Sequence, residues 1–213
     1  MRFVYPYKRL RDDQCINESI RWALNVYPDA EIYVVGDHVP GTINLEPRSR
    51  SSIRGCDVTH KILTFASLIG GDFIYMNDDF FLGPKFDPNR VLSCGLMVIN
   101  DRHAPTYQEA MQNTMDALKA MDCSTINFEC HAPVMINSDK LIELFDSITW
   151  SGHNHFIKSM YLNYYQVPHS PGENIKIAKD KKKAKEFLDL YGCFSISDQF
   201  MANKDTWKFI TTH

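Results

Sequence analysis

Residues 72–81 read Asp-Phe-Ile-Tyr-Met-Asn-Asp-Asp-Phe-Phe, an apolar run that ends abruptly in two neighbouring carboxylates. A short apolar run of this kind is typical of a buried strand in a parallel sheet. Two similar runs precede it, one at residues 3–5 and one at 31–37, and the second stops at a glycine. Helical periodicity fills the intervals, at residues 15–27 and 57–69. This alternation predicts an α/β fold with a mostly parallel, mixed central sheet and helices on both faces.

Further elements are expected downstream. Pro105 is suited to open a helix that places Met111 and Met115 on a core-facing side, and Asn137 is suited to cap the next helix. Asp57 is expected to cap the helix that Gly70 closes. The remaining expectations are a loop at 48–55, strands at 91–99, 174–178 and 193–197, and a helix at 180–191 that ends at Gly192. With no internal repeat and no glycine-rich linker, residues 1–213 are expected to form one domain.

The bulk properties exclude several classes of protein. The chain has 213 residues, 44% apolar composition and a net charge of −3, values that suit one buried core and do not suit disorder or a uniformly basic protein. No apolar run approaches the roughly 20 residues needed to span a bilayer. We therefore expect a soluble, cytoplasmic protein. The six cysteines show no CxxC spacing, so reduced thiols that mainly serve packing are expected.

Polar residues follow three of the predicted strands. In open α/β sheets, ligands bind outside the carboxyl ends of the strands. The clusters Pro6-Tyr7-Lys8, Gly36-Asp37 and Asn77-Asp78-Asp79 are therefore expected to line one crevice. The predicted ligand-binding residues at these strand ends are Tyr5, Pro6, Tyr7, Lys8, Gly36, Asp37 and Asn77.

Asp78 and Asp79 carry the strongest chemical signal. Two adjacent carboxylates at the end of a buried strand repel each other and lose hydration, and a divalent cation offsets both effects. Hard oxygen ligands suit Mg²⁺ or Mn²⁺. In an extended chain Asn77 and Asp79 share one face, so Asp79 is the first predicted metal ligand. Asp78 is expected to contact the ribose of a bound nucleotide or to orient a water. The competing interpretation is a polar turn in which one aspartate caps a neighbouring element.

Two further side chains are candidates. His131 is followed by Pro133, which restricts the local backbone, and the imidazole suits a metal ligand or a general base. A lone histidine is also common as a structural residue. Lys158, within residues 155–163, has the sequence context of an ordinary surface lysine.

Residues 72–81 closely resemble the second sequence block of the Stealth family, typically hFIYLNDDhhF. That family contains capsule-polymer sugar-1-phosphate transferases and the lysosomal-enzyme GlcNAc-1-phosphotransferase. Cys130-His131-Ala132-Pro133 is similar to the third block, which begins with His-x-Pro, and residues 20–26 are similar to an early LRYSLRSI segment. The chain also resembles short phage-encoded glycosyltransferases of the GT-A type, which begin V-Y-P-Y and carry a late R-S-L-Y-G-N motif, here Lys158–Asn163.

Position by position, the resemblance implies catalytic roles for Asp78, Asp79, His131 and Lys158, with metal contacts at Asp78, Asp79 and His131. It also implies that Arg21 and Lys61 are donor-side cations. Two departures weaken the case for phosphosugar transfer. Lys158 replaces the arginine that closes the Stealth site and lacks its bidentate geometry, and the long Stealth spacer is absent. For a phage-encoded chain, the implied location is the host cytoplasm.

The leading hypothesis is a metal-dependent glycosyltransferase that moves a sugar from a nucleotide-sugar donor to a hydroxyl acceptor. The alternatives are a Stealth-like sugar-1-phosphate transferase, a metal-dependent nuclease or phosphohydrolase, and a non-catalytic sugar or nucleotide binder. The acceptor is open. A basic run is either a solvated face or a contact for a polyanionic acceptor such as DNA or a phosphate-rich cell-wall polymer. This run comprises Lys176, Lys179, Lys181, Lys182, Lys183 and Lys185.

Overall fold

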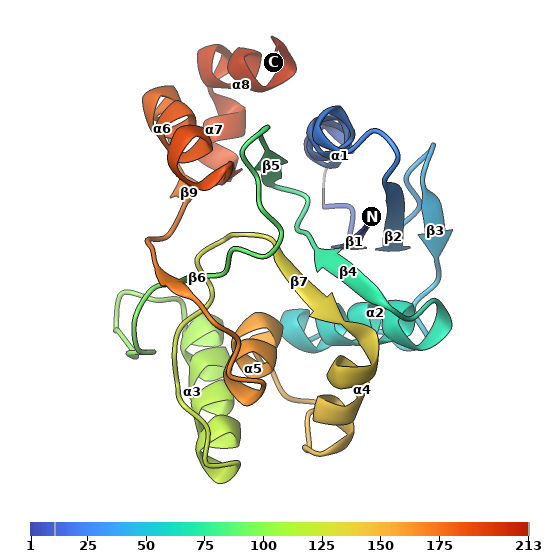
Figure 1. The fold of residues 1–213 in the computed structure, drawn as a ribbon, viewed down its shortest axis with the longest axis vertical. Helices are drawn as coiled ribbons and strands as arrows, with labels where there is room; N and C mark the ends of the chain where they lie inside the picture. The colour runs from blue at the N-terminus through green and yellow to red at the C-terminus, as the bar shows by residue number, and fades with distance from the viewer. Residues whose placement is uncertain (11, 213) are drawn as a thin grey trace.

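A five-stranded sheet forms the centre of the molecule (Figure 1). The computed structural model describes residues 1–10 and 12–212. The strands of this sheet are β1 (Arg2–Tyr7), β2 (Glu31–Gly36), β3 (Ile43–Leu45), β4 (Asp72–Tyr75) and β7 (Val134–Asn137). Their spatial order is β3-β2-β1-β4-β7; β3, β2, β1 and β4 run parallel, whereas β7 is antiparallel to β4. The predicted mixed, mostly parallel sheet is confirmed.

Helices cover both faces of the sheet because its central strands β1, β2 and β4 are apolar on both sides. Alternate residues of β1 enter different cores: Phe3 packs with α1 (Gln14–Val26), and Val4 packs with α2 (Arg54–Leu68) and α4 (Ser138–Asp146). Both residues are fully buried, and burial of a side chain of this size stabilises the fold by about 1.5–3 kcal/mol. The two-sided burial explains why the strands read as continuous apolar runs in the sequence.

A smaller sheet extends the core beyond the two aspartates. It contains β5 (Phe80–Leu82), β10 (Cys193–Ile196) and β9 (Lys176–Ile177), in the order β5-β10-β9. β5 begins directly after Asp79 and pairs antiparallel with β10, which in turn pairs parallel with β9. The C-terminal strands β9 and β10 thereby join the segment that follows Asp79 (Figure 1).

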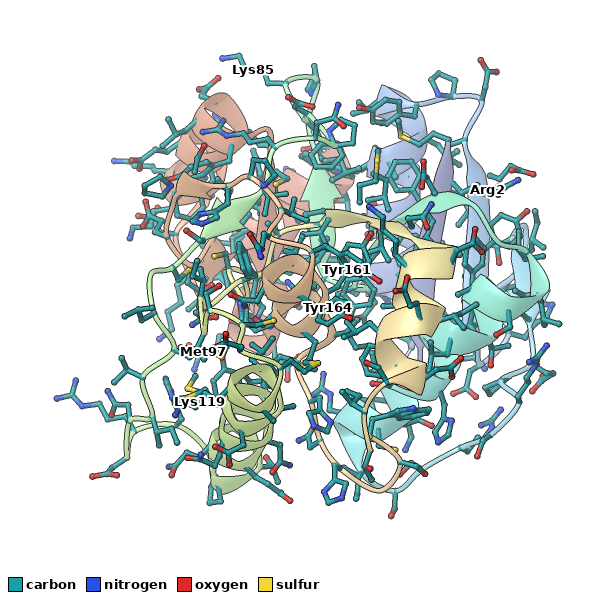
Figure 2. All side chains as sticks on the ribbon, turned by 60° about the horizontal axis from the view of Figure 1, so that its bottom comes forward. Arg2, Lys85, Met97, Lys119, Tyr161 and Tyr164 are labelled. Carbon is teal, nitrogen blue, oxygen red and sulfur yellow. The ribbon has the colours of Figure 1, made fainter. Side chains whose placement is uncertain are left out.

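The remaining elements surround these two sheets. α5 (Ile157–Tyr164) packs against the antiparallel edge of the large sheet, where the backbone N–H of Asn137 donates to the hydroxyl of buried Tyr161 over 3.0 Å. Figure 2 places Tyr161 inside the molecule and Arg2 and Lys85 at its outer edge. The other elements are α3 (Pro105–Ala120), α6 (Lys181–Tyr191), α7 (Asp198–Ala202), α8 (Lys204–Thr212), β6 (Leu92–Ser93) and β8 (Ser170–Pro171).

Several predicted helix signals are confirmed. Pro105 occupies the first turn of α3, and Met111 on that helix is buried. The Asn137 side chain accepts a hydrogen bond from the backbone N–H of Lys140 and caps α4. Gly192, at φ +74°, ends α6 in the left-handed conformation that glycine adopts without steric cost.

Two local predictions are wrong. Residues 91–99 do not form one strand; only Leu92–Ser93 is extended, because Gly95 turns the chain at φ +78° and the following backbone pairs with residues 125–127. Leu96 and Val98 consequently lie 67% and 68% exposed. Asp57 does not cap α2, because the helix begins earlier, at Arg54, and leaves Asp57 inside its first turn.

All six cysteines are free thiols in the structure. The sulfur atoms of Cys94 and Cys130 are in contact, 2.6 Å apart. Within the described residues, no helix combines the length and the apolar character that crossing a membrane requires.

Candidate functional site

The polar clusters that follow β1, β2 and β4 meet at one edge of the large sheet. Tyr7, the last residue of β1, pairs with Gly36, the last residue of β2, and the backbone N–H of Asp37 donates to the carbonyl of Tyr7. β4 is held in the same register by a hydrogen bond from Met76 N–H to the carbonyl of Val4. β1 and β2 therefore end together, whereas β4 ends beside Val4, so that the residues after it continue along the same edge.

A pocket of about 400 Å³ opens at this edge. Tyr7, Lys8 and Asp78 line one side, and α7 and α8 contribute Asp198 and Trp207 on the other. A second hollow, of about 500 Å³, lies between residues 122–128 and 162–169. Its central amide, Asn163, is already hydrogen-bonded to Ser124 and Ile126. The first pocket is the better candidate because it contains one of the two adjacent carboxylates.

The chain turns at the aspartates and is not extended there. The backbone N–H of Phe80 donates to the carbonyl of Asn77, which closes a turn over Asp78 and Asp79. The expectation that Asn77 and Asp79 share a face in extended geometry is therefore wrong. The carboxylates nevertheless diverge: Asp78 lines the pocket, whereas Asp79 faces the small sheet.

Asp79 is bound on one oxygen and unpartnered on the other. Its Oδ2 accepts hydrogen bonds from Lys176 Nζ over 2.8 Å and from Ser195 Oγ over 3.0 Å. Among the described residues, its Oδ1 is buried without a hydrogen-bond partner. A buried, unpaired carboxylate oxygen is costly, and an unpaired acceptor of this kind is suited to a cation or a water.

Asp78 has a perturbed acidity. Desolvation by the surrounding protein, followed by the charge of Asp79, raises the pKa of Asp78 to about 6. The side chain nevertheless remains open to solvent from the pocket. Because a carboxylate with a pKa near neutrality accepts a proton more readily than an ordinary aspartate, Asp78 is suited to the role of a general base.

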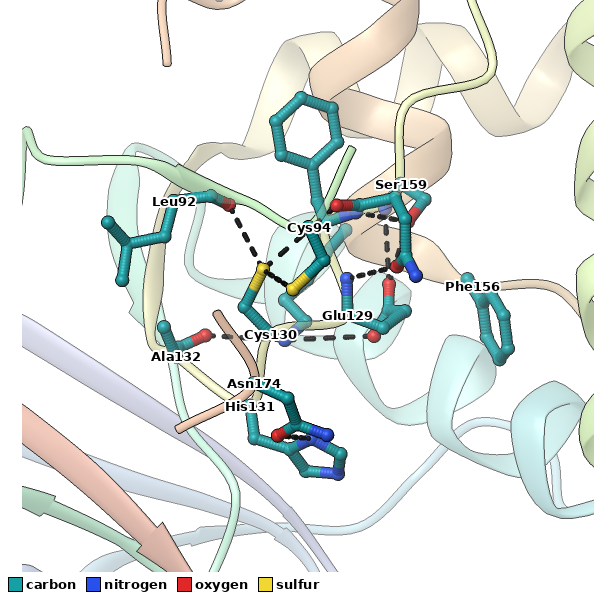
Figure 3. A network of polar contacts seen from close by, with 12 residues as sticks. Leu92, Cys94, Glu129, Cys130, His131, Ala132, Phe156, Ser159 and Asn174 are labelled. Atoms are coloured by element: carbon teal, nitrogen blue, oxygen red, sulfur yellow. Dashed lines mark hydrogen bonds and ion pairs between the residues drawn. The ribbon is translucent and has the colours of Figure 1, made fainter. Parts of the chain in front are cut away.

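The ring of His131 is oriented by its neighbours (Figure 3). His131 Nδ1 lies 3.0 Å from the Asn174 side-chain oxygen, which also accepts the backbone N–H of Lys176. Because that oxygen is an acceptor, Nδ1 carries the proton and Nε2 keeps a lone pair. Burial, together with the charges of Lys158 and Lys176, lowers the pKa of His131 to about 4, so the ring is neutral at pH 7. The backbone there is left-handed, at φ +55°.

Lys158 is a buried residue and not a surface lysine. It is 4% exposed, and its ammonium contacts Glu129 at 3.6 Å and donates to the carbonyl of Ala132 over 3.3 Å. Glu129 also accepts hydrogen bonds from the backbone and hydroxyl of Ser159 (Figure 3). The buried Lys158 ammonium thus lies beside the loop that carries His131 and is suited to hold that loop in place. The surface position that its sequence context suggested is wrong, and the catalytic role that the resemblance implies stays a prediction.

Replacement of Lys158 by methionine is therefore expected to lower the free energy of unfolding. The change leaves Glu129 without its cation, and loss of one partner from a buried pair costs about 3 kcal/mol or more. For a chain of this size that corresponds to a fall in melting temperature of roughly 6 °C or more. Thermal melts of Lys158→Met, Lys158→Arg and the exposed control Lys119→Met check this. A wild-type melting temperature in Lys158→Met would contradict the buried-pair assignment.

The other predicted donor-side cations are engaged elsewhere. Lys61 is 3% exposed and pairs with Asp57 over 2.7 Å, beneath the strand ends. Although burial opposes ionisation, Lys61 and the backbone N–H of Ser51 hold the pKa of Asp57 below its ordinary value. Arg21 pairs with Glu18 and donates to the carbonyl of Ile210, which ties α1 to α8. The structure does not place Arg21 among the residues that line the pocket.

The remaining predicted residues frame the strand ends. Tyr5 is buried with its hydroxyl against Ser19, and Pro6 continues β1. Gly36 has φ +129°, and a Cβ there would collide with the carbonyl of Tyr7 and lie 2.9 Å from Lys61 Cε, so only glycine fits between them. The Asp37 carboxylate accepts the backbone N–H of Arg9 over 2.7 Å.

Sequence reasoning missed the residues that the small sheet contributes. Lys176 was grouped with an exposed basic run, but its ammonium binds Asp79, whereas Lys181 and Lys182 lie exposed on α6. Ser195 carries no local signal, since it lies in an apolar strand of ordinary appearance. Only the pairing of β10 with β5 and β9 brings these side chains to Asp79.

No known protein family and no characterised protein matches the chain in sequence. Among solved structures, it is similar to a glycosyltransferase involved in the glycosylation of the major capsid of PBCV-1, with TM-score 0.46 and 8% identity over 100% of this chain and 98% of that one. It is also similar to the apo-form glycosyltransferase GlyE of Streptococcus pneumoniae TIGR4, with TM-score 0.44 and 10% identity over 100% of this chain and 60% of that one.

Proposed function

We propose that the chain is a glycosyltransferase that uses a nucleotide-sugar donor. The observation that carries the proposal is the pair Asp78-Asp79, held in a turn at the carboxyl end of β4 beside a pocket that opens where three parallel strands end. This is the edge at which open α/β sheets bind nucleotides. A pocket of about 400 Å³ suits part of a nucleotide sugar, and Tyr7, Lys8 and Trp207 offer it aromatic and cationic contacts.

A divalent cation, Mn²⁺ or Mg²⁺, is part of the proposal. Asp79 would hold it, because its Oδ1 has no hydrogen-bond partner among the described residues and its Oδ2 faces the partly exposed Lys176. Asp78, the second predicted ligand, diverges from Asp79 into the pocket and is left free to act as a base. Among the described residues, no three His, Cys, Asp or Glu side chains form a metal-binding group, so the predicted trio with His131 is not assembled as a cluster. Mg²⁺ is commonly held by one or two carboxylates together with substrate phosphates. When bound, the ion would supply positive charge to the departing nucleoside diphosphate.

Two side chains of the protein are placed to accept the proton that the acceptor hydroxyl loses. As the acceptor oxygen bonds to the anomeric carbon, the bond from that carbon to the diphosphate breaks, and the acceptor hydroxyl loses its proton. Asp78 is the preferred base because it lines the pocket and has a raised pKa of about 6. His131 Nε2, with its lone pair, is the alternative base. The acceptor is proposed to be a polyanionic polymer, DNA or a cell-wall phosphate polymer, contacted by the exposed lysines of α6.

Incubation with Mn²⁺ and a panel of sugar nucleotides tests this function. Release of a nucleoside diphosphate is expected for sugar transfer. Release of a nucleoside monophosphate would support sugar-1-phosphate transfer instead, and cleavage of nucleic acid without any sugar nucleotide would support a nuclease. Binding of sugar nucleotides with no turnover on any polyanionic acceptor would leave a binding module and overturn the proposal.

The assignment of Asp78 as base predicts an acid limb in the pH dependence. Since the pKa of Asp78 is raised to about 6, protonation removes the base as pH falls through 6, and kcat/KM is expected to fall about tenfold per pH unit below that value. Activity should be level above about pH 7. Initial rates between pH 5 and 8 check this. A limb that persists unchanged in the residual activity of Asp78→Asn would assign it to another group.

A further inference from the structure

Lys176 occupies the position from which a divalent cation would approach Asp79. Its ammonium lies 2.8 Å from Asp79 Oδ2, and about a third of the side chain, 34%, remains exposed. The other carboxylate oxygen, Oδ1, is buried. A cation that arrives from solvent therefore meets Oδ2 first, and the lysine already neutralises that oxygen.

The position of Lys176 is set by the backbone. Lys176 is the direct partner of Ser195 in the parallel pairing of β9 with β10, so the two side chains share one face of the small sheet. Both reach the same oxygen of Asp79. The backbone N–H of Lys176 is in turn bound by the Asn174 side chain, which also holds His131. The contact is thus built into the sheet pairing and is not a chance encounter of two surface side chains.

We infer that Lys176 is an internal cation that neutralises Asp79 in the donor-free protein and competes with the divalent ion for that carboxylate. The inference rests on the proposed function, which supplies the reason for an ion at this site. An ammonium and a divalent ion on one carboxylate repel each other, so binding of the ion requires the lysine to move off Oδ2. The exposure of its side chain leaves room for that movement. The predicted consequence is weak ion binding until a donor diphosphate brings its own negative charge.

Calorimetric titration of Mn²⁺ into the nucleotide-free protein tests whether Lys176 competes with the ion for Asp79. Lys176→Met is expected to bind Mn²⁺ at least tenfold more tightly than wild type, because Asp79 loses its resident cation. Lys176→Arg, which keeps the positive charge, is expected to bind as weakly as wild type. Lys182→Met is the matched control, an exposed lysine from the same basic run. Melting temperatures establish that each variant is folded.

Three outcomes would overturn the inference. The first is Mn²⁺ affinity in Lys176→Met that is equal to or weaker than in wild type. The second is equal tightening in Lys182→Met, which would mean that general charge and not the Asp79 contact is responsible. The third is absence of Mn²⁺ binding in every variant.

The result is separable from that of the proposed function because the titration uses no sugar nucleotide. If Lys176→Met binds Mn²⁺ more tightly but the wild-type protein turns over no donor, the competition between Lys176 and the ion is supported and the proposed glycosyltransferase function is rejected. If the wild-type protein releases nucleoside diphosphate but Lys176→Met has an unchanged Mn²⁺ affinity, the proposed glycosyltransferase function is supported and the competition is rejected.

Discussion

Asp79→Ala is expected to abolish sugar transfer, with a loss of at least about 10³-fold in kcat. The substitution removes the carboxylate that lies at the end of β4, binds Lys176 and Ser195, and carries the unpartnered oxygen. Metal-dependent donor binding should be lost with it. Diphosphate release and Mn²⁺ titration, measured on the same preparation, check both effects.

The fold should survive this change. Lys176 is partly exposed and can be solvated, whereas buried Ser195 loses one acceptor, which costs about 1 kcal/mol. A melting temperature within a few degrees of wild type is therefore expected, and Ser195→Ala serves as the control for the lost hydrogen bond alone. Near-normal turnover of Asp79→Ala in Mn²⁺ would remove Asp79 from the site.

His131→Ala carries the second large effect, an expected loss of roughly 10² or more in kcat. The structure supports a chemical role because Nδ1 is occupied by Asn174 and the lone pair of Nε2 is left for a proton or a ligand. A purely structural histidine would instead lower the melting temperature and leave the kinetics nearly unchanged. Thermal melts and initial rates on one preparation distinguish the two roles.

The left-handed backbone at His131 calls for a second variant. Asparagine tolerates φ +55° better than alanine does, so His131→Asn removes the imidazole with less backbone strain. Loss of activity in both variants, with an unchanged melting temperature in His131→Asn, is the expected result. His169→Ala, which removes a ring packed on Phe128 away from the strand ends, is the control. A destabilised but active His131→Asn would contradict the chemical role.

The wrong prediction at residues 91–99 shows where local pattern fails. The apolar composition of this segment suits a strand, but a strand requires a partner along its length, and residues 125–127 pair with it only around the turn at Gly95. The exposure of Leu96 and Val98 follows from that turn. Apolar composition does not distinguish a buried strand from a loop whose partner lies thirty residues away.

The sequence by itself predicted β1, β2 and β4 of the large sheet and the edge at which the candidate site lies, whereas β3 and β7 were not predicted. β1, β2 and β4 are apolar on both faces, and that composition suits only strands buried between helices. Since parallel strands end at the same edge, the position of Asp78 after β4 was enough to predict that it would line a pocket with Tyr7 and Lys8; Gly36, Asp37 and Asp79 are not among the residues that line this pocket. Short-range pattern and strand direction carry this information, and both can be read from neighbouring residues.

Only the tertiary structure decided which cations surround the carboxylates. Lys61 pairs with Asp57 one turn earlier on the same helix, whereas Lys158 and Lys176 pair with the distant residues Glu129 and Asp79. The contact between Lys176 and Asp79 spans 97 positions and depends on the register of β9 on β10. A lysine carries the same charge in every context. For Lys158 and Lys176 the acidic partner is set by contacts between segments far apart in the chain, which leave no mark on the residues beside the lysine.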